Sequence, residues 1–131
     1  MKYIVLLGRI LFSAMFLISA PHHFTSGVIG YASKYGVPAA SFLVPFAGIL
    51  ALLGGISILL GYKAKLGAWL IVLFLIPVTF MMHAFWKETD PMQTQMQMIN
   101  FMKNLSMLGG ALLITYFGAG PLSFDARSKP A

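Results

Sequence analysis

The chain has 131 residues, of which 59% are hydrophobic and only 9% are charged, and its mean hydropathy is +0.85. Soluble domains carry about 25% charged residues, so this composition excludes an ordinary soluble domain. The formal net charge is +6, but the nine cationic residues are scattered, which argues against a nucleic-acid partner. The absence of cysteine excludes disulfides, thiol chemistry and metal sites with Cys ligands.

Four apolar runs follow one another along the chain, each close to the roughly 17 to 25 residues that cross about 30 Å of hydrocarbon. They are too long and too uniformly apolar for the strands of a membrane barrel. The expected helices cover about residues 3–20, 38–60, 64–86 and 93–117. The sequence therefore predicts an all-α integral membrane four-helix bundle, with residues 1–131 forming one multi-pass domain in a bacterial inner membrane.

The first run resembles a signal peptide, because Lys2 precedes an apolar stretch that ends in "ISAP". Three features favour a retained helix instead. Ile18 stands where a small residue is expected, Pro21 follows the cleavage position, and Arg9 interrupts the apolar stretch.

Cationic residues gather on one side of the predicted bundle. They are Lys2, Lys63, Lys65, Arg127 and Lys129. The other side carries Lys34 and the mixed segment 87–90. The positive-inside rule then predicts that both termini lie in the cytoplasm.

Glycines of the second helix, and the "LGG" at 108–110 of the fourth, are marks of close packing. Gly48, Ala51 and Gly55 share one stripe of the second helix, and small residues let membrane helices approach each other. Pro45 and Pro77 lie inside the second and third helices and are expected to bend them.

Amides recur on one face of the fourth helix. At 100° per residue, Gln97, Asn100 and Asn104 fall within a narrow arc, with Lys103 on its shoulder. Lipid cannot satisfy amides, so this face is expected to look into the bundle or into a wet cavity. For Asn100 and Asn104, simple bridging between helices is an open alternative.

Lys103 is the most demanding residue in this region, because a cation inside a membrane helix costs about 2.5 to 3.5 kcal/mol unless it is compensated. The three acids lie in predicted loops or the tail, so no membrane carboxylate can neutralise it. Arg9 is close enough to the cytoplasmic end to reach lipid phosphate. We therefore expect a pocket near the outer leaflet for a quinone headgroup or a small anion. The candidate ligand-binding residues are Arg9, His23, His83, Trp86, Gln97, Asn100, Lys103 and Asn104.

Methionines offer a rival interpretation of the same region, because thioether sulfur and histidine together bind Cu(I). These residues are Met81, Met82, Met92, Met96, Met98, Met102 and Met107. Methionine also fills irregular apolar space, and we take packing as its expected role. No metal site is predicted.

Three stretches resemble the DoxX family of small four-helix membrane proteins. They are "GRILFSAMFLISAPHHF", "PFAGILALLGGISILLGYKAKLGAWL", and "HAFW" followed by "QMQMINFMKNLSMLGGALL". The most specific residues are His83, Phe85, Trp86, Gln97, Asn100, Phe101, Lys103 and Asn104. Through that family's relation to a subunit of a thiosulfate:quinone oxidoreductase, the resemblance implies a quinone-linked redox role. Many such proteins have a glutamate where this chain has Ala51, which weakens a proton-relay role.

Three classes of function remain open at this point. The first is a quinone-associated oxidoreductase subunit whose redox partner protein supplies electrons, because the chain has no haem, flavin or cysteine motif of its own. The second is a non-catalytic accessory or lipid-binding protein that stabilises a redox or stress-response complex, alone or as a homo-oligomer. The third is a small transporter, although no inverted repeat is visible in four helices.

Overall fold

A computed structural model describes residues 1–128, and Lys129, which contributes to the predicted charge bias, lies outside this range. The described part is all helical, as predicted. Its elements are α1 (Lys2–Ser19), η1 (Ala20–Phe24), α2 (Ser26–Lys34), α3 (Ala40–Leu60), α4 (Ala64–Met82), η2 (Phe85–Lys87), α5 (Pro91–Phe117) and α6 (Phe124–Arg127).

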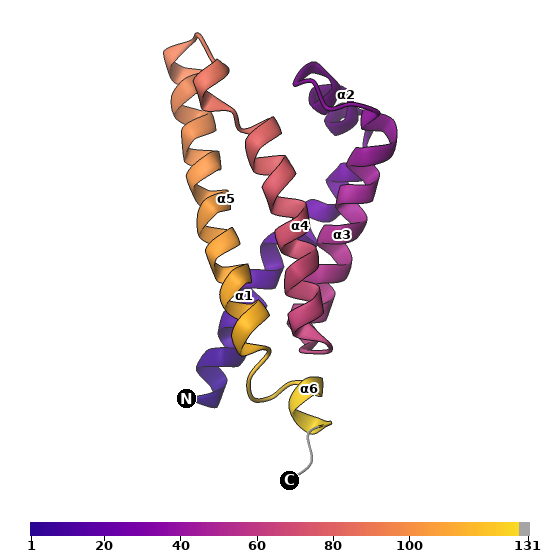
Figure 1. The fold of residues 1–131 in the computed structure, drawn as a ribbon, viewed down its shortest axis with the longest axis vertical. Helices are drawn as coiled ribbons and strands as arrows, with labels where there is room; N and C mark the ends of the chain where they lie inside the picture. Colours follow the sequence, from indigo (N-terminus) through magenta and orange to yellow (C-terminus); the bar gives the residue numbers. More distant parts are fainter. Residues whose placement is uncertain (129–131) are drawn as a thin grey trace.

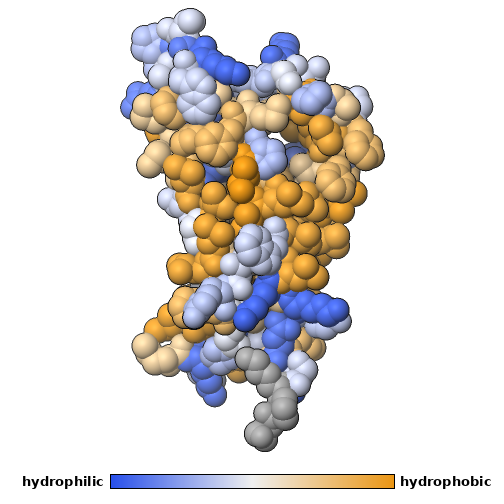
Figure 2. Space-filling model, in the orientation of Figure 1, coloured by the Kyte–Doolittle hydropathy of each residue, from blue (hydrophilic) through white to orange (hydrophobic). Residues whose placement is uncertain are grey.

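Three stretches of helix are long and apolar enough to cross a membrane, namely Lys2–Phe24, Ala40–Leu60 and Ala64–Lys87. With 27 residues, α5 is longer than any of the other helices, but its amides lower its hydropathy. Figure 2 shows an apolar band around the middle of the molecule, with polar residues gathered at both ends. The chain therefore has the surface of a membrane protein, while the fourth span remains a prediction.

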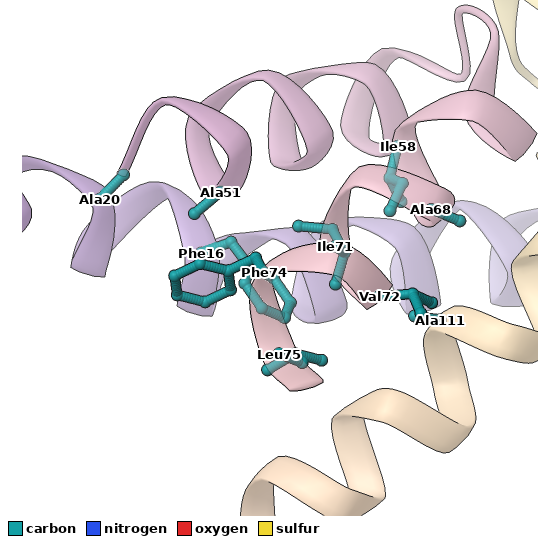
Figure 3. Packing of buried hydrophobic residues seen from close by; sticks show 10 residues of the cluster. All are labelled: Phe16, Ala20, Ala51, Ile58, Ala68, Ile71, Val72, Phe74, Leu75 and Ala111. Atoms are coloured by element: carbon teal, nitrogen blue, oxygen red, sulfur yellow. The ribbon is translucent and has the colours of Figure 1, made fainter. Parts of the chain in front are cut away.

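The core lies where α1, α3 and α4 meet, and α5 contributes Ala111 at its edge (Figure 3). The rings of Phe16 and Phe74 approach edge to face with centroids 6.2 Å apart. A β-carbon at Gly54 would lie 2.8 Å from the carbonyl oxygen of Gly67, so α3 and α4 touch backbone to backbone. The stripe of small residues predicted for α3 packs against η1 and α1 instead, because β-carbons at Gly48 and Gly55 would meet His23 and Leu17. Both contacts stabilise the bundle through van der Waals packing.

The two ends of the molecule differ in their construction (Figure 1). Both described ends of the chain lie at the end that carries α6, whereas α2 and η2 lie at the opposite end. The sequence did not predict α2, which begins where the Thr25 hydroxyl accepts a hydrogen bond from the Val28 amide at 3.4 Å. Both α3 and α4 remain continuous through Pro45 and Pro77.

Candidate functional site

A cavity of about 460 Å³ lies between α1, α2, α3 and α4, towards the end of the molecule that carries α2. Its walls are almost entirely apolar, and they include the fully buried Phe16 and Leu75. Other wall residues are themselves exposed on the apolar band: Met15 by 46%, Phe46 by 45% and Leu73 by 56%. The cavity therefore opens sideways, and Figure 2 shows the surface hollowed near that end.

Three of the residues predicted to bind a ligand reach this cavity together. They are His23 from η1, His83 at the end of α4 and Asn104 from α5. Ser19 is the other polar residue in the wall. A volume of this size with apolar walls and a few convergent polar groups is typical of small-molecule sites, which range from about 300 to 1,000 Å³.

His23 is held in place by the last residue of α1, by a ring on α4 and by the close approach of α3. Its Nδ1 lies 3.1 Å from the carbonyl oxygen of Ser19, and its ring packs on Phe74 with centroids 5.4 Å apart. A β-carbon at Gly48 would lie only 2.6 Å from the His23 β-carbon. Any larger residue at position 48 would therefore clash with His23.

His83 is held by a chain of polar side chains that leads to the molecular surface. Its Nδ1 lies 2.8 Å from Gln97 Oε1, and Gln97 Nε2 donates to the hydroxyl oxygens of Tyr31 at 3.0 Å and Tyr35 at 3.5 Å. The Tyr35 hydroxyl in turn donates to Glu88 Oε1 at 3.0 Å. Gln97 is buried, so it orients His83 from behind and does not line the cavity.

Tyr35 lies in the connection between α2 and α3 and retains its proton over a wide pH range. Hydrogen bonding with Tyr31, and then with the Glu88 carboxylate, raises the pKa of Tyr35 to about 12. The hydroxyl is therefore a steady donor to Glu88.

Trp86 and Asn100 are outside the cavity wall. Trp86 is 52% exposed, and its ring meets Phe85 at 5.2 Å and Phe101 at 5.7 Å between centroids. Asn100 is half-buried on α5 and forms no side-chain hydrogen bond within residues 1–128. Trp86 thus belongs to an aromatic cluster between η2 and α5 that packs beside the cavity.

Lys103 differs most from its expected position. Its side chain is exposed on the surface of α5 and does not line the cavity. The three carboxylates are engaged elsewhere. Glu88 accepts from Tyr35, Asp90 caps α5 by accepting from the Gln93 amide at 3.1 Å, and Asp125 caps α4. Consecutive side chains of an α-helix point about 100° apart around its axis. Asn104 faces inward, so the side chain of Lys103 points away from it.

Arg9 lies at the opposite end of the molecule, where it is only 4% exposed. It donates to the carbonyl oxygens of Leu59 at 3.2 Å and Pro121 at 3.3 Å, and also to that of Leu122. It was expected to reach lipid phosphate, but backbone carbonyls at the end of α3 and in the C-terminal segment hold it instead. Arg9 is therefore a link between elements, remote from the cavity.

The C-terminal segment folds back onto this Arg9 link. Asp125 accepts from the amides of Lys63 at 2.7 Å and Ala64 at 2.9 Å, so it caps the first turn of α4. Gly61 adopts a φ of +67°, which favours glycine, and a β-carbon there would lie 2.4 Å from an Arg9 nitrogen. Sequence reasoning missed this capping, although Asp125 is one of only three acidic residues and follows the last apolar helix.

The methionines divide between two environments. Met81, Met82 and Met107 line the cavity, whereas Met92, Met96, Met98 and Met102 are exposed on α5. Within residues 1–128, no group of three or more His, Asp or Glu side chains could hold a metal ion. The methionines at the cavity add to its apolar wall.

The comparisons with known proteins concern nearly the whole chain. The profile of the SURF4 family matches residues 1–130. The Escherichia coli inner membrane protein YqjF is 31% identical over 123 residues, which cover 92% of this chain and 88% of that protein. The E. coli inner membrane protein YphA is 27% identical over 101 residues, covering 77% and 71%.

A yeast protein shares a shorter region. The Saccharomyces cerevisiae ER-derived vesicles protein ERV29 is 33% identical over 70 residues, which cover 53% of this chain. The match spans only 22% of the yeast protein, or about a fifth of its length. No solved structure matches the chain.

These matches correct one prediction and confirm another. The resemblance to the DoxX family was wrong, because the family profile that covers the chain is a different one. Helices, glycine stripes and short polar segments recur in many small membrane proteins, which explains the misassignment. The predicted location is confirmed by the two inner-membrane relatives and the apolar helices. The chain is a multi-pass inner-membrane protein, and it belongs to the SURF4 family.

Proposed function

We propose that this chain is a non-catalytic membrane protein that binds an amphipathic molecule in the cavity between α1, α3 and α4. The observation that carries the proposal is the combination of a volume of about 460 Å³, apolar walls and a polar group of His23, His83 and Asn104. An acyl or prenyl chain buried against such walls gains roughly 0.8 kcal/mol per CH₂ group. The polar head would meet the two histidines and the amide.

An amphipathic ligand fits this site better than a small anion. No Lys or Arg lines the cavity in the described part of the chain. Lys103 is exposed on α5, and Arg9 is bound at the other end. A bare anion among Leu, Val and Met side chains would lose its hydration without gaining a counter-charge, which costs several kcal/mol.

A quinone belongs to the same amphipathic class, so a quinone-associated role is the second proposal. The size and apolar character of the cavity favour it. A redox role would require a partner protein that exchanges electrons with the bound quinone, because the chain contains no cysteine and no cofactor motif. Deletion of the gene would then abolish substrate-dependent quinone reduction in isolated membranes. An unchanged rate of quinone reduction would contradict the redox role and leave the non-catalytic binding role standing.

We further propose that α5 is a fourth membrane span, that residues 1–131 form one domain, and that both termini lie in the cytoplasm. The 27-residue length of α5 and the position of both described chain ends beside α6 support this arrangement. So do the cations Lys63, Lys65 and Arg127 at that end. The cavity would then open towards the outer leaflet, and membrane lipids are the nearest source of its ligand.

Photolabelling tests the binding proposal directly. The full chain in lipid nanodiscs is exposed to a phosphatidylcholine probe that carries a diazirine on its acyl chain, and labelled residues are mapped by mass spectrometry. Phe16 and Leu75 are each 1% exposed, so they are labelled only by a probe that enters the cavity. We expect saturable labelling at these two residues.

Two matched substitutions on α3 sharpen this experiment. Ala47→Trp places a large side chain in the cavity wall, whereas Leu53→Trp adds a similar side chain at a position 52% exposed outside it. Labelling of Phe16 and Leu75 should be lost in the first variant and retained in the second. Equal labelling in both folded variants, or none in the wild type, would refute the proposal.

A further inference from the structure

The tautomers of the two cavity histidines point to the class of the ligand, an inference that rests on the binding function proposed above. A neutral imidazole carries one proton, so one ring nitrogen donates and the other accepts. The group bonded to Nδ1 decides which nitrogen is which. Both histidines have Nδ1 bonded inside the protein, so both assignments follow from their neighbours.

For His23 the assignment is immediate. Its Nδ1 lies 3.1 Å from the carbonyl oxygen of Ser19, and a carbonyl oxygen can only accept. The proton therefore lies on Nδ1. The other nitrogen, Nε2, carries a lone pair.

For His83 the assignment follows from Glu88 through two side chains, those of Tyr35 and Gln97. A carboxylate only accepts hydrogen bonds, so the Tyr35 hydroxyl must donate its one hydrogen bond to Glu88 Oε1, at 3.0 Å. The Tyr35 oxygen can then only accept from Gln97, which must turn its Nε2 amide towards both tyrosines. Gln97 Oε1 is left facing His83 Nδ1 at 2.8 Å. His83 Nδ1 must donate, and its Nε2 is also an acceptor.

Neither Nε2 has a hydrogen-bond partner within residues 1–128, and both histidines line the cavity. The two histidines of the cavity wall are therefore each left with one acceptor, whereas Asn104 offers a side-chain N–H donor and the Ser19 hydroxyl donates to the Phe16 carbonyl oxygen at 3.4 Å. A head that carries only acceptors, such as the carbonyls of a quinone, can accept from Asn104 but leaves both Nε2 atoms without a donor. A head with a hydroxyl group supplies the missing donor.

We propose that the cavity binds an amphipathic alcohol, whose hydroxyl group donates to Nε2 of His83 while its hydrocarbon chain lies along the apolar wall. Gln97 acts as a positioning residue, because it fixes the tautomer of His83 without touching the ligand. The proposal separates alcohols from ethers and quinones with the same chain.

The experiment measures competition with the photoprobe for Phe16 and Leu75 by hexadecanol and by methyl hexadecyl ether, at pH 8 in nanodiscs. The two competitors share a hydrocarbon chain and differ in the hydroxyl donor. One hydrogen bond is worth roughly tenfold in affinity. We therefore expect hexadecanol to compete at about tenfold lower concentration than the ether. If both compete equally, or if neither displaces a saturable label, the alcohol inference is wrong while the binding function stands. If the probe gives no saturable labelling of Phe16 and Leu75, the binding function itself fails.

Two variants of α5 and one of α4 test the cause of the preference. His83→Phe removes the acceptor and should bring the alcohol-to-ether ratio close to one while the ether still competes. Gln97→Met keeps the length of the side chain but frees the tautomer, so the ratio should fall severalfold. Gln95→Met, at an exposed position of α5, should keep the tenfold ratio. An unchanged ratio in Gln97→Met, or a reduced one in Gln95→Met, would overturn the positioning role.

Discussion

Replacing Arg9 should destabilise the protein through the end of the molecule opposite the cavity. Arg9 joins α1 to the end of α3 and to the C-terminal segment through the carbonyl oxygens of Leu59, Pro121 and Leu122. Hydrogen bonds from a charged donor contribute about 1.5 to 3 kcal/mol each. The carbonyls are near the molecular end and regain water in Arg9→Met, and the buried charge no longer has to be desolvated. We therefore expect a net loss of about 2 to 4 kcal/mol.

The loss is measured by unfolding the full chain in mixed micelles with increasing SDS, followed by circular dichroism. Arg127→Met is the matched control, because Arg127 belongs to the same end of the molecule but is exposed. The control should change stability by less than about 0.5 kcal/mol. Equal effects of the two substitutions would refute the link that we assign to Arg9. Limited proteolysis offers a second readout, because Arg9→Met should expose the segment 119–128 to cleavage.

Three further predictions concern the cavity end. Gly48→Ala should displace His23 and weaken probe labelling, since its β-carbon would lie 2.6 Å from that of His23, whereas Gly109→Ala meets nothing within 4 Å and should leave labelling unchanged. Lys103→Met should retain full labelling of Phe16 and Leu75, because Lys103 is outside the cavity wall. A loss of labelling in this variant would show that Lys103 does contribute to ligand binding. The raised pKa of Tyr35, about 12, means that its contribution to stability is complete below the ordinary tyrosine pKa of about 10 and is lost as pH rises towards 12. The difference in unfolding free energy between wild type and Tyr35→Phe should therefore shrink between pH 9 and pH 11.5, and a difference that grows would contradict the assignment.

The membrane helices could be predicted from the sequence because hydrocarbon imposes one simple requirement on them. A run of about 20 apolar residues satisfies its own backbone only as a helix, so α1, α3 and α4 were visible without any tertiary information. Their small residues also predicted close packing, and Gly54 and Gly67 do bring two backbones together. The amide face of α5 was predicted to point inward, and Gln97 and Asn104 are indeed buried.

The geometry of the site was harder to predict, because it depends on which elements bend over the cavity mouth. Tyr31 and Tyr35 are not among the predicted site residues, yet the unexpected helix α2 and the residue after it bring their hydroxyl groups to Gln97. Arg9 and His23 were predicted to bind the same ligand, but Arg9 lies in α1 at one end of the first span and His23 lies in η1 at the other. Periodicity gives the direction of a side chain and leaves its depth and its partners open.

The resemblance to another family failed for a related reason. The stretches that suggested it consist of apolar helices, glycine pairs and an aromatic segment after the third span. These features meet demands that the bilayer places on any compact helical membrane protein. Lys103 was predicted to bind the ligand because of its charge. Its position on α5 leaves the side chain exposed, outside the cavity wall.

Native mass spectrometry of the wild-type protein, released from mild detergent after purification from its own membranes, tests the central claim most directly. We expect one retained amphipathic molecule per chain, with a hydroxyl group in its head. That molecule should be lost in Ala47→Trp and kept in Leu53→Trp. A wild-type chain that carries no such molecule, or the same bound lipids in all three proteins, would contradict a ligand site in the cavity.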